Sequence, residues 1–273
     1  MAESPTRYGT FYGVSLGPGD PGLITCRAWA LLERRDAVWV YPARSSRTPS
    51  YAFDIVSRAG LTPPAQHQTL LFPMTHDAEK LVRSWSRAAD VVLPLLQAGR
   101  DVMFLVEGDA STYATFGHLL RVLRERDAAV PVEVVAGVNS FSAASAALAR
   151  PLCEQDDTVA IVPAAYGVSA IDRLLQDFDS LVLLKVKPLI EDLFDWLEAR
   201  GLLADACFIE RCGAPDERVV RGAAMLALRG STVSYLSLML VKSPHRVRGE
   251  RIRGCLKKAG PGGVSALATA EEE

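Results

Sequence analysis

The chain has 273 residues, 49% of them hydrophobic, and its 30 basic and 32 acidic residues give a formal net charge of −2. This length exceeds that of most single domains and leaves room for a large apolar core. The near-neutral balance excludes a global field that would draw the chain to nucleic acid or to an anionic membrane. Any anionic partner must therefore be bound by a local cluster of cations.

The five cysteines are scattered along the chain: Cys26, Cys153, Cys207, Cys212 and Cys255. None has a cysteine or histidine partner at metal-ligand spacing, so we expect reduced, mostly buried thiols and no metal site. The first residues lack a basic segment followed by a long apolar run, and no apolar run approaches the ~20 residues that span a bilayer. The sequence therefore predicts a cytoplasmic protein that is neither secreted nor embedded in a membrane.

Apolar patterning in the first half of the chain predicts alternating strands and helices. The segments "TFYGVSL", "DAVWVYP", "DVMFLVEGD" and "VPVEVVAGVNS" are typical of buried strands that end in turns. Helical spacing is present over residues 21–35, 77–97 and 112–126, and the small-residue segment "FSAASAALA" predicts a helix suited to close packing. Such alternation is typical of parallel sheets.

The second half supplies four more strand-like segments, "TVAIVPA", "SLVLLKV", "DACFIER" and "VSYLSLMLV", with helices expected between the first three. We therefore predict an α/β protein of two domains, residues 1–127 and 128–245, which meet near residues 127–131. Residues 246–273 start with a basic run and end in "EEE", which is typical of a flexible, solvated tail. A nucleic-acid-binding arm is the alternative interpretation of this tail.

The turn "LGPGDPGLIT" contains the pattern G-x-G-x-x-G from Gly17, which is found in dinucleotide-binding turns. A dinucleotide site needs free backbone N–H groups, and an acidic residue about 20 positions further on. Here Pro18 and Pro21 remove two donors, Asp20 would repel a pyrophosphate, and the next strand ends in "WVYPARSS" without a carboxylate. Asp20 followed by Pro21 fits a helix N-cap with proline at the first helical position. The sequence therefore argues against an NAD site.

Four separated stretches resemble one family, the tetrapyrrole (corrin and porphyrin) methylases, which use S-adenosylmethionine (SAM). They are "GPGDPGLIT", "LVEGDASTYATF", "VVAGVNSFSAASAALARPL" and "IERCGAPDERVV", which start at Gly17, Leu105, Val134 and Ile209. They follow the order and spacing of the family between about Tyr12 and Val241. Two places depart from the family pattern: Ala110 replaces a proline, and "AGVNS" with Asn139 replaces P-G-I-T-S.

The resemblance implies two α/β domains, each a mixed sheet flanked by helices, with the active site in the cleft between them. The first domain would hold the tetrapyrrole, and the second would contribute to the SAM cleft. Within the family, "LLFPMTHD", "FLVEGDASTYATF" and "YLSLMLV" are similar to the C(20)-methyltransferases of precorrin-2 and of cobalt-factor II in vitamin B12 synthesis. The implied reaction moves the SAM methyl group to a meso carbon of the macrocycle, giving precorrin-3A from precorrin-2, in a homodimer.

Two other functions stay open at this point. One is a SAM methylase of the same fold that acts on RNA or on a protein side chain, although an RNA enzyme is expected to have a basic face. The other is a SAM-binding module that has lost catalysis. Methyl transfer itself is an in-line displacement that needs no covalent nucleophile, so most of the rate should come from positioning and desolvation.

By resemblance, eight residues line the SAM cleft: Pro18, Gly108, Asp109, Thr112, Asn139, Ser140, Lys185 and Gly213. Glycine turns at strand ends suit this role because they let the backbone approach a ligand closely. Asp109 has two interpretations. It either orients SAM hydroxyl or amino groups from the end of its strand, or it caps the next helix.

The implied tetrapyrrole carries many carboxylates, so the cleft needs local cations. Arg44 and Arg47 share the loop after the second strand and are the predicted substrate-binding residues, because a guanidinium binds a carboxylate bidentately. Solvated surface charges are the alternative. Tyr12 and Tyr113 are candidates to position a hydroxyl near the reacting carbon, with packing in the core as the alternative.

Overall fold

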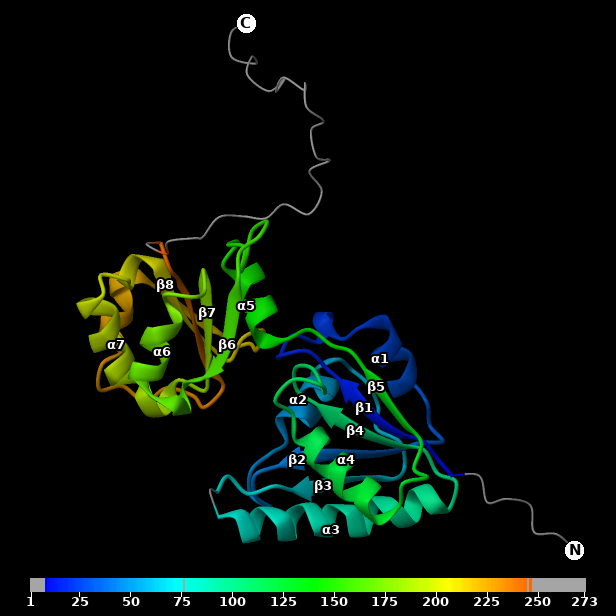
Figure 1. Ribbon diagram of the computed structural model, residues 1–273. Helices are drawn as coiled ribbons and strands as arrows, with labels where there is room; N and C mark the ends of the chain where they lie inside the picture. The colour runs from blue at the N-terminus through cyan, green and yellow to red at the C-terminus, as the bar shows by residue number, and fades with distance from the viewer. Residues whose placement is uncertain (1–7, 76, 245, 247–273) are drawn as a thin grey trace, which may run out of the picture.

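The structure is a computed structural model that describes residues 8–75, 77–244 and 246. It contains two five-stranded sheets with helices packed on them, and the chain passes from the first sheet to the second through one connection (Figure 1). The first sheet has the order β3-β2-β4-β1-β5, with β1 (Phe11–Ser15), β2 (Val38–Ala43), β3 (His67–Leu71), β4 (Val102–Val106) and β5 (Val132–Val135). The second has the order β6-β7-β10-β8-β9, with β6 (Val159–Pro163), β7 (Ser180–Leu184), β8 (Ala206–Glu210), β9 (Arg218–Arg221) and β10 (Ser237–Lys242).

Seven α-helices accompany these strands in the described residues: α1 (Cys26–Leu32), α2 (Tyr51–Arg58), α3 (Ala78–Gln97), α4 (Thr115–Arg126), α5 (Ser140–Ala147), α6 (Val168–Leu174) and α7 (Ile190–Ala199). Five short 3-10 helices complete the chain: η1 (Pro21–Leu23), η2 (Ala164–Tyr166), η3 (Lys187–Leu189), η4 (Leu203–Asp205) and η5 (Gly222–Leu228). The predicted α/β class is confirmed. The strand pairings refine it, because the first sheet is parallel throughout and the second is mixed.

Alternation along β4 shows how the first sheet buries both of its faces. Phe104 belongs to the apolar cluster that includes residues of α3 and α4, and Met103 and Leu105 belong to the opposite cluster with α1 and α2. Successive side chains of a strand point to opposite faces, so a strand covered on both sides must be apolar at every position. All five residues of β4 are buried, as this requirement predicts.

Helices also cover both faces of the second sheet. Leu193 and Phe194 of α7 join Ile171 of α6 in a cluster on one face, together with residues of η5. On the other face, Ala143 and Ala144 of α5 pack against Cys207 in β8. The small side chains of α5 allow this close packing, as its sequence predicted. In Figure 1, α5 is the first helix after the chain leaves the first sheet.

The glycine-rich turn after β1 contains the predicted N-cap, but the helix predicted over residues 21–35 is divided into η1 and α1. The backbone N–H of Gly22 donates to Asp20 Oδ1 at 2.8 Å, and Pro21 occupies the first position of η1. Thr25 then caps α1 by accepting a hydrogen bond from the Ala28 amide at 3.3 Å. Because η1 has three residues, the turn does not aim a long helix at a phosphate, which agrees with the rejection of an NAD site.

The predicted division between domains lies one strand ahead of the change of sheet. β5 follows residue 127 but pairs with β1 in the first sheet, from Phe11 opposite Val132 to Val14 opposite Val135. The change of sheet therefore falls between β5 and β6, with α5 in the connection. The predicted division was too early because the turn residues before β5 mark the end of α4. They do not mark the end of the first sheet, to which β5 belongs.

Three elements were absent from the sequence prediction: α2, β3 and β9. β3 reads "HQTLL", and Leu70 is its one buried residue because the strand lies at an edge of the sheet. β9 reads "RVVR", is also an edge strand and has no fully buried residue. Edge strands of this kind lack the apolar run from which a buried strand is predicted.

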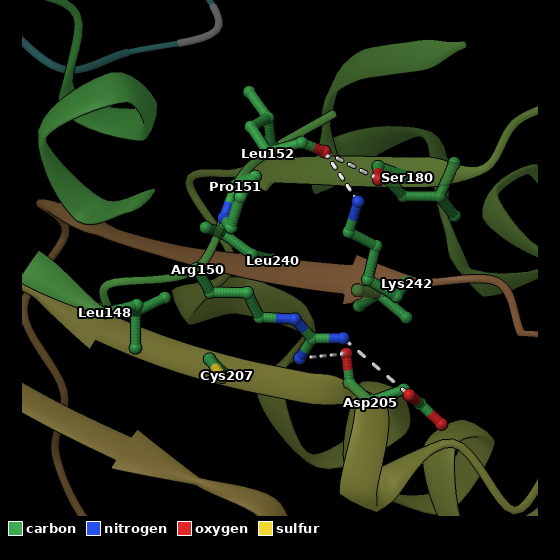
Figure 2. A pocket seen from close by; sticks show the side chains of 11 residues that line it. Leu148, Arg150, Pro151, Leu152, Ser180, Asp205, Cys207, Leu240 and Lys242 are labelled. Atoms are coloured by element: carbon green, nitrogen blue, oxygen red, sulfur yellow. Dashed lines mark hydrogen bonds and ion pairs between the residues drawn. The ribbon is translucent and has the colours of Figure 1, made fainter. Parts of the chain in front are cut away.

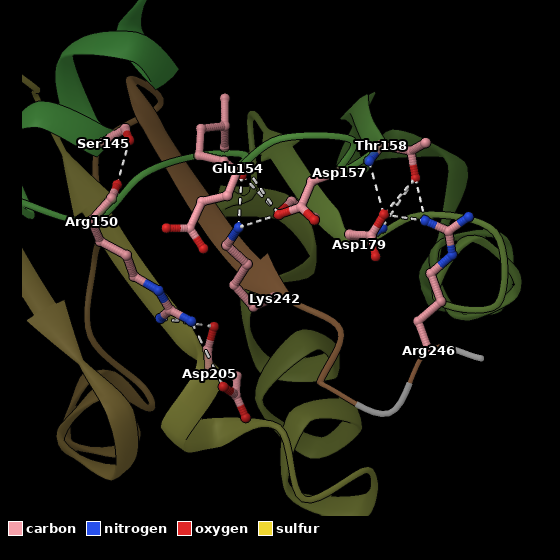
Figure 3. Close-up of polar contacts among 11 residues, drawn as sticks. Ser145, Arg150, Glu154, Asp157, Thr158, Asp179, Asp205, Lys242 and Arg246 are labelled. Carbon is pink, nitrogen blue, oxygen red and sulfur yellow. Dashed lines mark hydrogen bonds and ion pairs between the residues drawn. The ribbon is translucent and has the colours of Figure 1, made fainter. Parts of the chain in front are cut away.

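Polar contacts hold the end of the described chain to the second domain (Figure 3). Lys242 Nζ donates to the Leu152 carbonyl at 3.0 Å and lies 3.5 Å from Asp157 Oδ2. Arg246, the first residue of the predicted tail, pairs with Asp179 and contacts Thr158. Residues 247–273 lie outside the described residues, so the flexible tail stays a prediction.

A steric test of the first core uses Gly13 in β1 and Gly117 in α4. A Cβ on Gly13 would lie 2.8–3.0 Å from ring atoms of Phe116, which itself stacks on Phe11 at 5.0 Å between ring centroids. We expect Gly13→Ala to lower the free energy of unfolding by about 1–3 kcal/mol through overpacking, measured by urea denaturation.

The matched control is Gly117→Ala, where an added Cβ meets nothing within 4 Å. Because alanine is the better helix former, this variant should be as stable as the parent or up to ~1 kcal/mol more stable. Equal stability of the two variants would contradict the packing described for β1 and α4.

Candidate functional site

A two-hydrogen-bond bridge joins the carboxyl ends of β1 and β4. The Gly17 amide donates to the Gly108 carbonyl at 3.1 Å, and the Gly108 amide donates to the Gly17 carbonyl at 2.7 Å. Both glycines have φ of 76°, a conformation that residues with a Cβ rarely adopt. The following helices, α1 and α4, lie on opposite faces of the sheet. This is the switch point of an open parallel sheet, where ligands bind.

Asp109 connects the loops that follow β4 and β5. Its Oδ2 accepts a hydrogen bond from the Gly137 amide at 2.7 Å, and its Oδ1 accepts from the Ser111 amide at 2.9 Å. The hydroxyls of Ser111 and Thr112 also donate to Oδ1. Burial of the carboxyl raises its pKa, but these hydrogen bonds together outweigh burial and hold the pKa of Asp109 below its usual range.

Ser15 and Gly137 show how tightly the three strand ends are packed. Ser15 Oγ accepts a hydrogen bond from the Ala110 amide at 2.8 Å. A Cβ on Gly137 would lie 2.3 Å from the Ser15 Cβ and 2.7 Å from the Gly108 carbonyl oxygen. Position 137 therefore requires glycine. By contrast, a Cβ on Gly108 would meet nothing within 4 Å, so space is open above that turn.

The arrangement excludes one of the two interpretations of Asp109, the capping of the next helix. The N-cap of α4 is Ala114, which makes no side-chain capping bond, so Asp109 does not cap that helix. Its hydrogen bonds go to the turn 109–112 and to Gly137. Asp109 thus fixes the loops at the switch point, and a direct contact with a ligand stays a prediction.

The second domain presents the carboxyl ends of β7 and β8, with the start of β10 between them. The Lys185 amide donates to the Ser237 carbonyl at 3.0 Å, and the Arg211 amide donates to the Leu236 carbonyl at 2.7 Å. Lys185 and Arg211 have φ of 57° and 52°, in the left-handed region. Such strained non-glycine residues gather at functional sites.

Three cation–ring contacts connect the two domains. The guanidinium carbon of Arg44 lies 4.8 Å from the ring centroid of Tyr235, and that of Arg211 lies 5.3 Å from the ring centroid of Tyr51. Lys185 Nζ lies 5.9 Å from the ring centroid of Tyr113, another residue with positive φ. Each pair joins one residue of each domain. These distances lie within the range in which a cation attracts an aromatic face.

The backbones of the domains also approach each other closely at two glycines. A Cβ on Gly19 would lie 2.6 Å from the Cys212 carbonyl oxygen, and a Cβ on Gly213 would lie 2.7 Å from the Asp20 amide nitrogen. The Pro18 carbonyl in the same turn accepts a hydrogen bond from the Tyr51 hydroxyl at 3.1 Å. The predicted cleft residues Pro18 and Gly213 therefore lie at one crossing of the two domains.

The structure brings most predicted cleft residues to this crossing and to the switch point. The predicted residues Gly108, Asp109 and Thr112 form the turn after β4. Asn139 is the N-cap of α5 without a side-chain capping bond, and Ser140 is the first residue of that helix. These two residues lie two and three positions beyond Gly137, which binds Asp109.

The two tyrosine candidates differ in position. Tyr12 is the second residue of β1 and packs against the cluster of α1 and α2. It lies three residues, or roughly 10 Å, before the end of the strand, so its contacts are those of the packing alternative. Tyr113 is 54% exposed at the crossing of the domains, and its hydroxyl donates to the Ile161 carbonyl at 3.3 Å.

Both predicted substrate-binding arginines are exposed in the loop after β2. Arg44 contacts Tyr235 as described, and its charge also acts on Glu107. Within the described residues, the Arg47 guanidinium makes no ion pair. The loop thus presents two cations beside the crossing of the domains.

Three residues of the site, Tyr51, Tyr235 and Glu107, were not predicted from the sequence. Tyr51 and Tyr235 read as ordinary aromatic residues, because their cation partners are distant in the chain. Glu107 did carry a signal, since a charged residue directly follows the five buried apolar residues of β4.

Within the described residues, the cavity of Figure 2, the metal-ligating side chains and the Cys212 thiol give no competing site. The cavity of Figure 2 lies in the second domain between Arg150, Leu152 and Lys242, and its volume of about 20 Å³ holds at most one water molecule. No three metal-ligating side chains gather in the described part of the chain. Burial beside Glu217 raises the pKa of the Cys212 thiol to about 12, so this thiol stays protonated. Over the same residues, no helix combines the length and apolarity needed to cross a bilayer.

The geometry defines a class: a two-domain α/β protein whose candidate ligand site lies at strand ends where the domains meet. The chain belongs to the tetrapyrrole (corrin/porphyrin) methylase family, whose sequence profile matches residues 10–225. This confirms the predicted family.

Relatives in that family cover most of the chain. The chain is 32% identical over 246 residues to the cobalamin biosynthesis protein CobIJ of Mycobacterium tuberculosis. This alignment covers 87% of this chain and 47% of that protein. The chain thus spans about half the length of these mycobacterial relatives. It is 31% identical to a probable cobalt-precorrin-2 C(20)-methyltransferase of Methanocaldococcus jannaschii, with 85% of this chain and 95% of that protein covered. A precorrin-2 C(20)-methyltransferase of Sinorhizobium sp is 30% identical over the same shares.

Solved structures share the fold. A cobalamin biosynthetic enzyme, the cobalt precorrin-4 methyltransferase CbiF, has a TM-score of 0.64 at 22% identity, with 85% of this chain and 94% of that chain covered. The uroporphyrin-III C-methyl transferase of Thermus thermophilus, solved with S-adenosyl homocysteine, has a TM-score of 0.57 at 24% identity over 86% and 97% of the chains.

A prediction concerns the charge of Asp109. We expect Asp109→Asn to lower the free energy of unfolding by about 2 kcal/mol at pH 7, because the NH2 group that replaces one carboxylate oxygen cannot accept a hydrogen bond from the facing donor. Since the pKa of Asp109 is lowered in the fold, its contribution is full above the unfolded-state pKa of about 3.9 and is lost as pH falls through the lowered value.

Urea unfolding of both proteins between pH 7 and pH 3 measures this effect. The difference in stability should be constant above about pH 5 and shrink below about pH 4. Asp90→Asn, which removes an exposed partner of Arg126, is the control and should cost at most ~1 kcal/mol. A difference for Asp109→Asn that does not change with pH would contradict the hydrogen-bonded carboxylate.

Proposed function

We propose that the chain is a SAM-dependent methyltransferase that acts on C(20) of precorrin-2 or of its cobalt-containing counterpart in cobalamin biosynthesis. One observation supports this most: the turns that carry the family motifs meet at the switch point, with open space above Gly108 and cations beside it. Relatives with these two names cover 85% of the chain at 30% and 31% identity. We also propose a cytoplasmic homodimer, from the family likeness.

The residues present fit SAM as the methyl donor. Gly108 leaves room for a ligand to approach the backbone, and the turn around it is held rigid by Asp109 and Gly17. Rigid backbone groups at a strand end can position a ligand without reorganising. We propose that Pro18, Gly108, Thr112, Asn139, Ser140, Lys185 and Gly213 line the SAM cleft, with Asp109 holding its shape. SAM, when bound, supplies an electrophilic methyl group on a sulfonium.

The chain's own contribution is to hold the two reactants in line and to exclude water. The contacts of Arg44, Lys185 and Arg211 with rings of the other domain keep the two domains together. Arg44 and Arg47 are proposed to bind the carboxylates of the macrocycle. Arginine suits this task because its planar fork donates two parallel hydrogen bonds to a carboxylate.

The reaction is tested by incubating the purified chain with SAM and with precorrin-2 or cobalt-precorrin-2 in separate assays. We expect one of the two products to be heavier by one methyl group in mass spectrometry, and its absorption spectrum identifies the preferred form. Tight SAM binding in calorimetry with no methylation of either substrate would contradict the proposal. That outcome would favour a SAM-binding module or a methylase of RNA or protein.

The substrate role of the arginine loop makes a separate prediction. The double variant Arg44→Ala, Arg47→Ala should raise the KM for the tetrapyrrole by about tenfold or more. The reason is that a hydrogen bond to a charged group contributes about 1.5–3 kcal/mol. The KM for SAM should change much less. Steady-state kinetics with each substrate varied in turn measures both values.

The control is Arg83→Ala on α3, an exposed arginine whose guanidinium pairs with Glu79 of the same helix. It should leave both KM values unchanged. Equal changes in the two KM values of the double variant would contradict carboxylate binding by Arg44 and Arg47.

A further inference from the structure

Glu107 carries a carboxyl group at the candidate site. This group has no part in the contacts proposed for SAM or for the tetrapyrrole. Glu107 follows β4 directly and precedes Gly108 of the bridge. Among the described residues, its carboxyl forms no ion pair and no hydrogen bond with another side chain, and its own amide is the one hydrogen-bonding group that acts on it. The residue is partly exposed. A partly exposed carboxyl that no other side chain holds, at the edge of the sheet where ligands bind, is available to a substrate.

The contrast with Asp109, two residues later, is sharp. Asp109 accepts hydrogen bonds from two amides and two hydroxyls, and these lower its pKa. Burial raises the pKa of Glu107, and the charge of Arg44 opposes this rise without cancelling it. Two neighbouring carboxyls whose environments drive their pKa values apart are typical of a site that uses them in different roles.

Strand alternation indicates the side of the sheet on which Glu107 lies. Met103 and Leu105 point toward α1 and α2, so the same alternation places Glu107 on that side of the strand end. Tyr51 belongs to that side as well, and its hydroxyl binds the turn after β1. Arg44 comes from the loop after β2, the neighbouring strand. The carboxyl therefore shares its surroundings with the proposed substrate-binding loop and the domain crossing.

We propose that Glu107 is a catalytic residue, the general base that removes the proton from the carbon to which the methyl group is transferred. The proposal rests on the proposed function, because methylation of a meso carbon that keeps its conjugation must release that proton. In the first step the S–CH₃ bond breaks with its electron pair staying on sulfur, and a π pair of the macrocycle forms the new C–CH₃ bond.

In the second step the C–H bond at the same carbon breaks, and its electron pair restores the conjugation of the macrocycle. The proton goes to a carboxylate oxygen of Glu107, which later releases it to solvent. No oxidant or further reactant is needed. A carboxyl with a raised pKa suits this exchange, because a base works best when its pKa is near the working pH. Arg44 is the charged side chain of the described residues that acts on this carboxyl, and it keeps the ionised form accessible.

The test compares Glu107→Gln with the unaltered chain on the substrate form that the unaltered chain methylates. We expect kcat to fall by about 100-fold or more, with SAM affinity in calorimetry unchanged. The acidic limb of the kcat–pH profile should disappear. With substrate deuterated at the reacting carbon, the unaltered chain should show little isotope effect, and Glu107→Gln should show a primary effect because proton removal has become slow.

Stability separates this role from a structural one. Since the pKa of Glu107 is raised in the fold, ionisation costs stability as pH rises above the unfolded-state value of about 4.3. Glu107→Gln should therefore be at least as stable as the unaltered chain at pH 8. Glu125→Gln, an exposed glutamate on α4, is the matched control and should change neither rate nor stability. As a second variant, Glu107→Ala should regain activity when formate is added.

The outcomes distinguish the two proposals. If the unaltered chain methylates neither tetrapyrrole, the proposed function fails. If it does methylate one and Glu107→Gln keeps the rate, the pH profile and the absence of an isotope effect, then Glu107 is not the base. A lower rate that is accompanied by lost SAM affinity, with no isotope effect and no formate rescue, would overturn the assignment and make Glu107 a binding residue.

Discussion

The two hydrogen bonds between Gly17 and Gly108 are the constraint on which the site depends. They join the ends of β1 and β4, strands whose following helices lie on opposite faces of the first sheet. At each of these two glycines the backbone turns sharply away from its strand. The positive φ of both residues allows this turn. Pro18 on one side, and Glu107 and Asp109 on the other, are thereby held at fixed places. A ligand at this edge meets backbone that has little freedom to move.

Contacts between the domains extend this rigid edge across the molecule. Arg44, Lys185 and Arg211 each lie against a ring of the other domain, and Gly19 leaves no space for a side chain beside Cys212. Cation–ring contacts are individually weak, on the order of 0.5–2 kcal/mol, so these side chains can rearrange at low cost. Close backbone packing at Gly19 is not adjustable in this way. The molecule thus combines a fixed crossing with adjustable side chains around it.

Most of the fold could be predicted from the sequence, because its central strands are buried on both sides and read as continuous apolar runs. β1, β2, β4 and β7 are of this kind. The edge strands β3 and β9 were not predicted, because each pairs with one neighbouring strand only and is less buried. They therefore lack a continuous apolar run. The division between domains was placed ahead of β5 because turn residues precede that strand. Its pairing with β1 depends on a contact between segments more than a hundred residues apart.

The candidate site, like the fold, was predictable from the sequence only in part. The sequence by itself determined the order of the elements, the glycine turns and the family, because turn residues and motifs act over a few neighbouring positions. It also identified Asp109, Arg44 and Gly213 as candidate site residues. Only the tertiary structure decided that Asp109 is occupied by the amide of Gly137, 28 residues away, and that the carboxyl of Glu107 is left without such a partner. The physical reason is that hydrogen-bond satisfaction and burial are set by neighbours in space, and these come from distant parts of the chain.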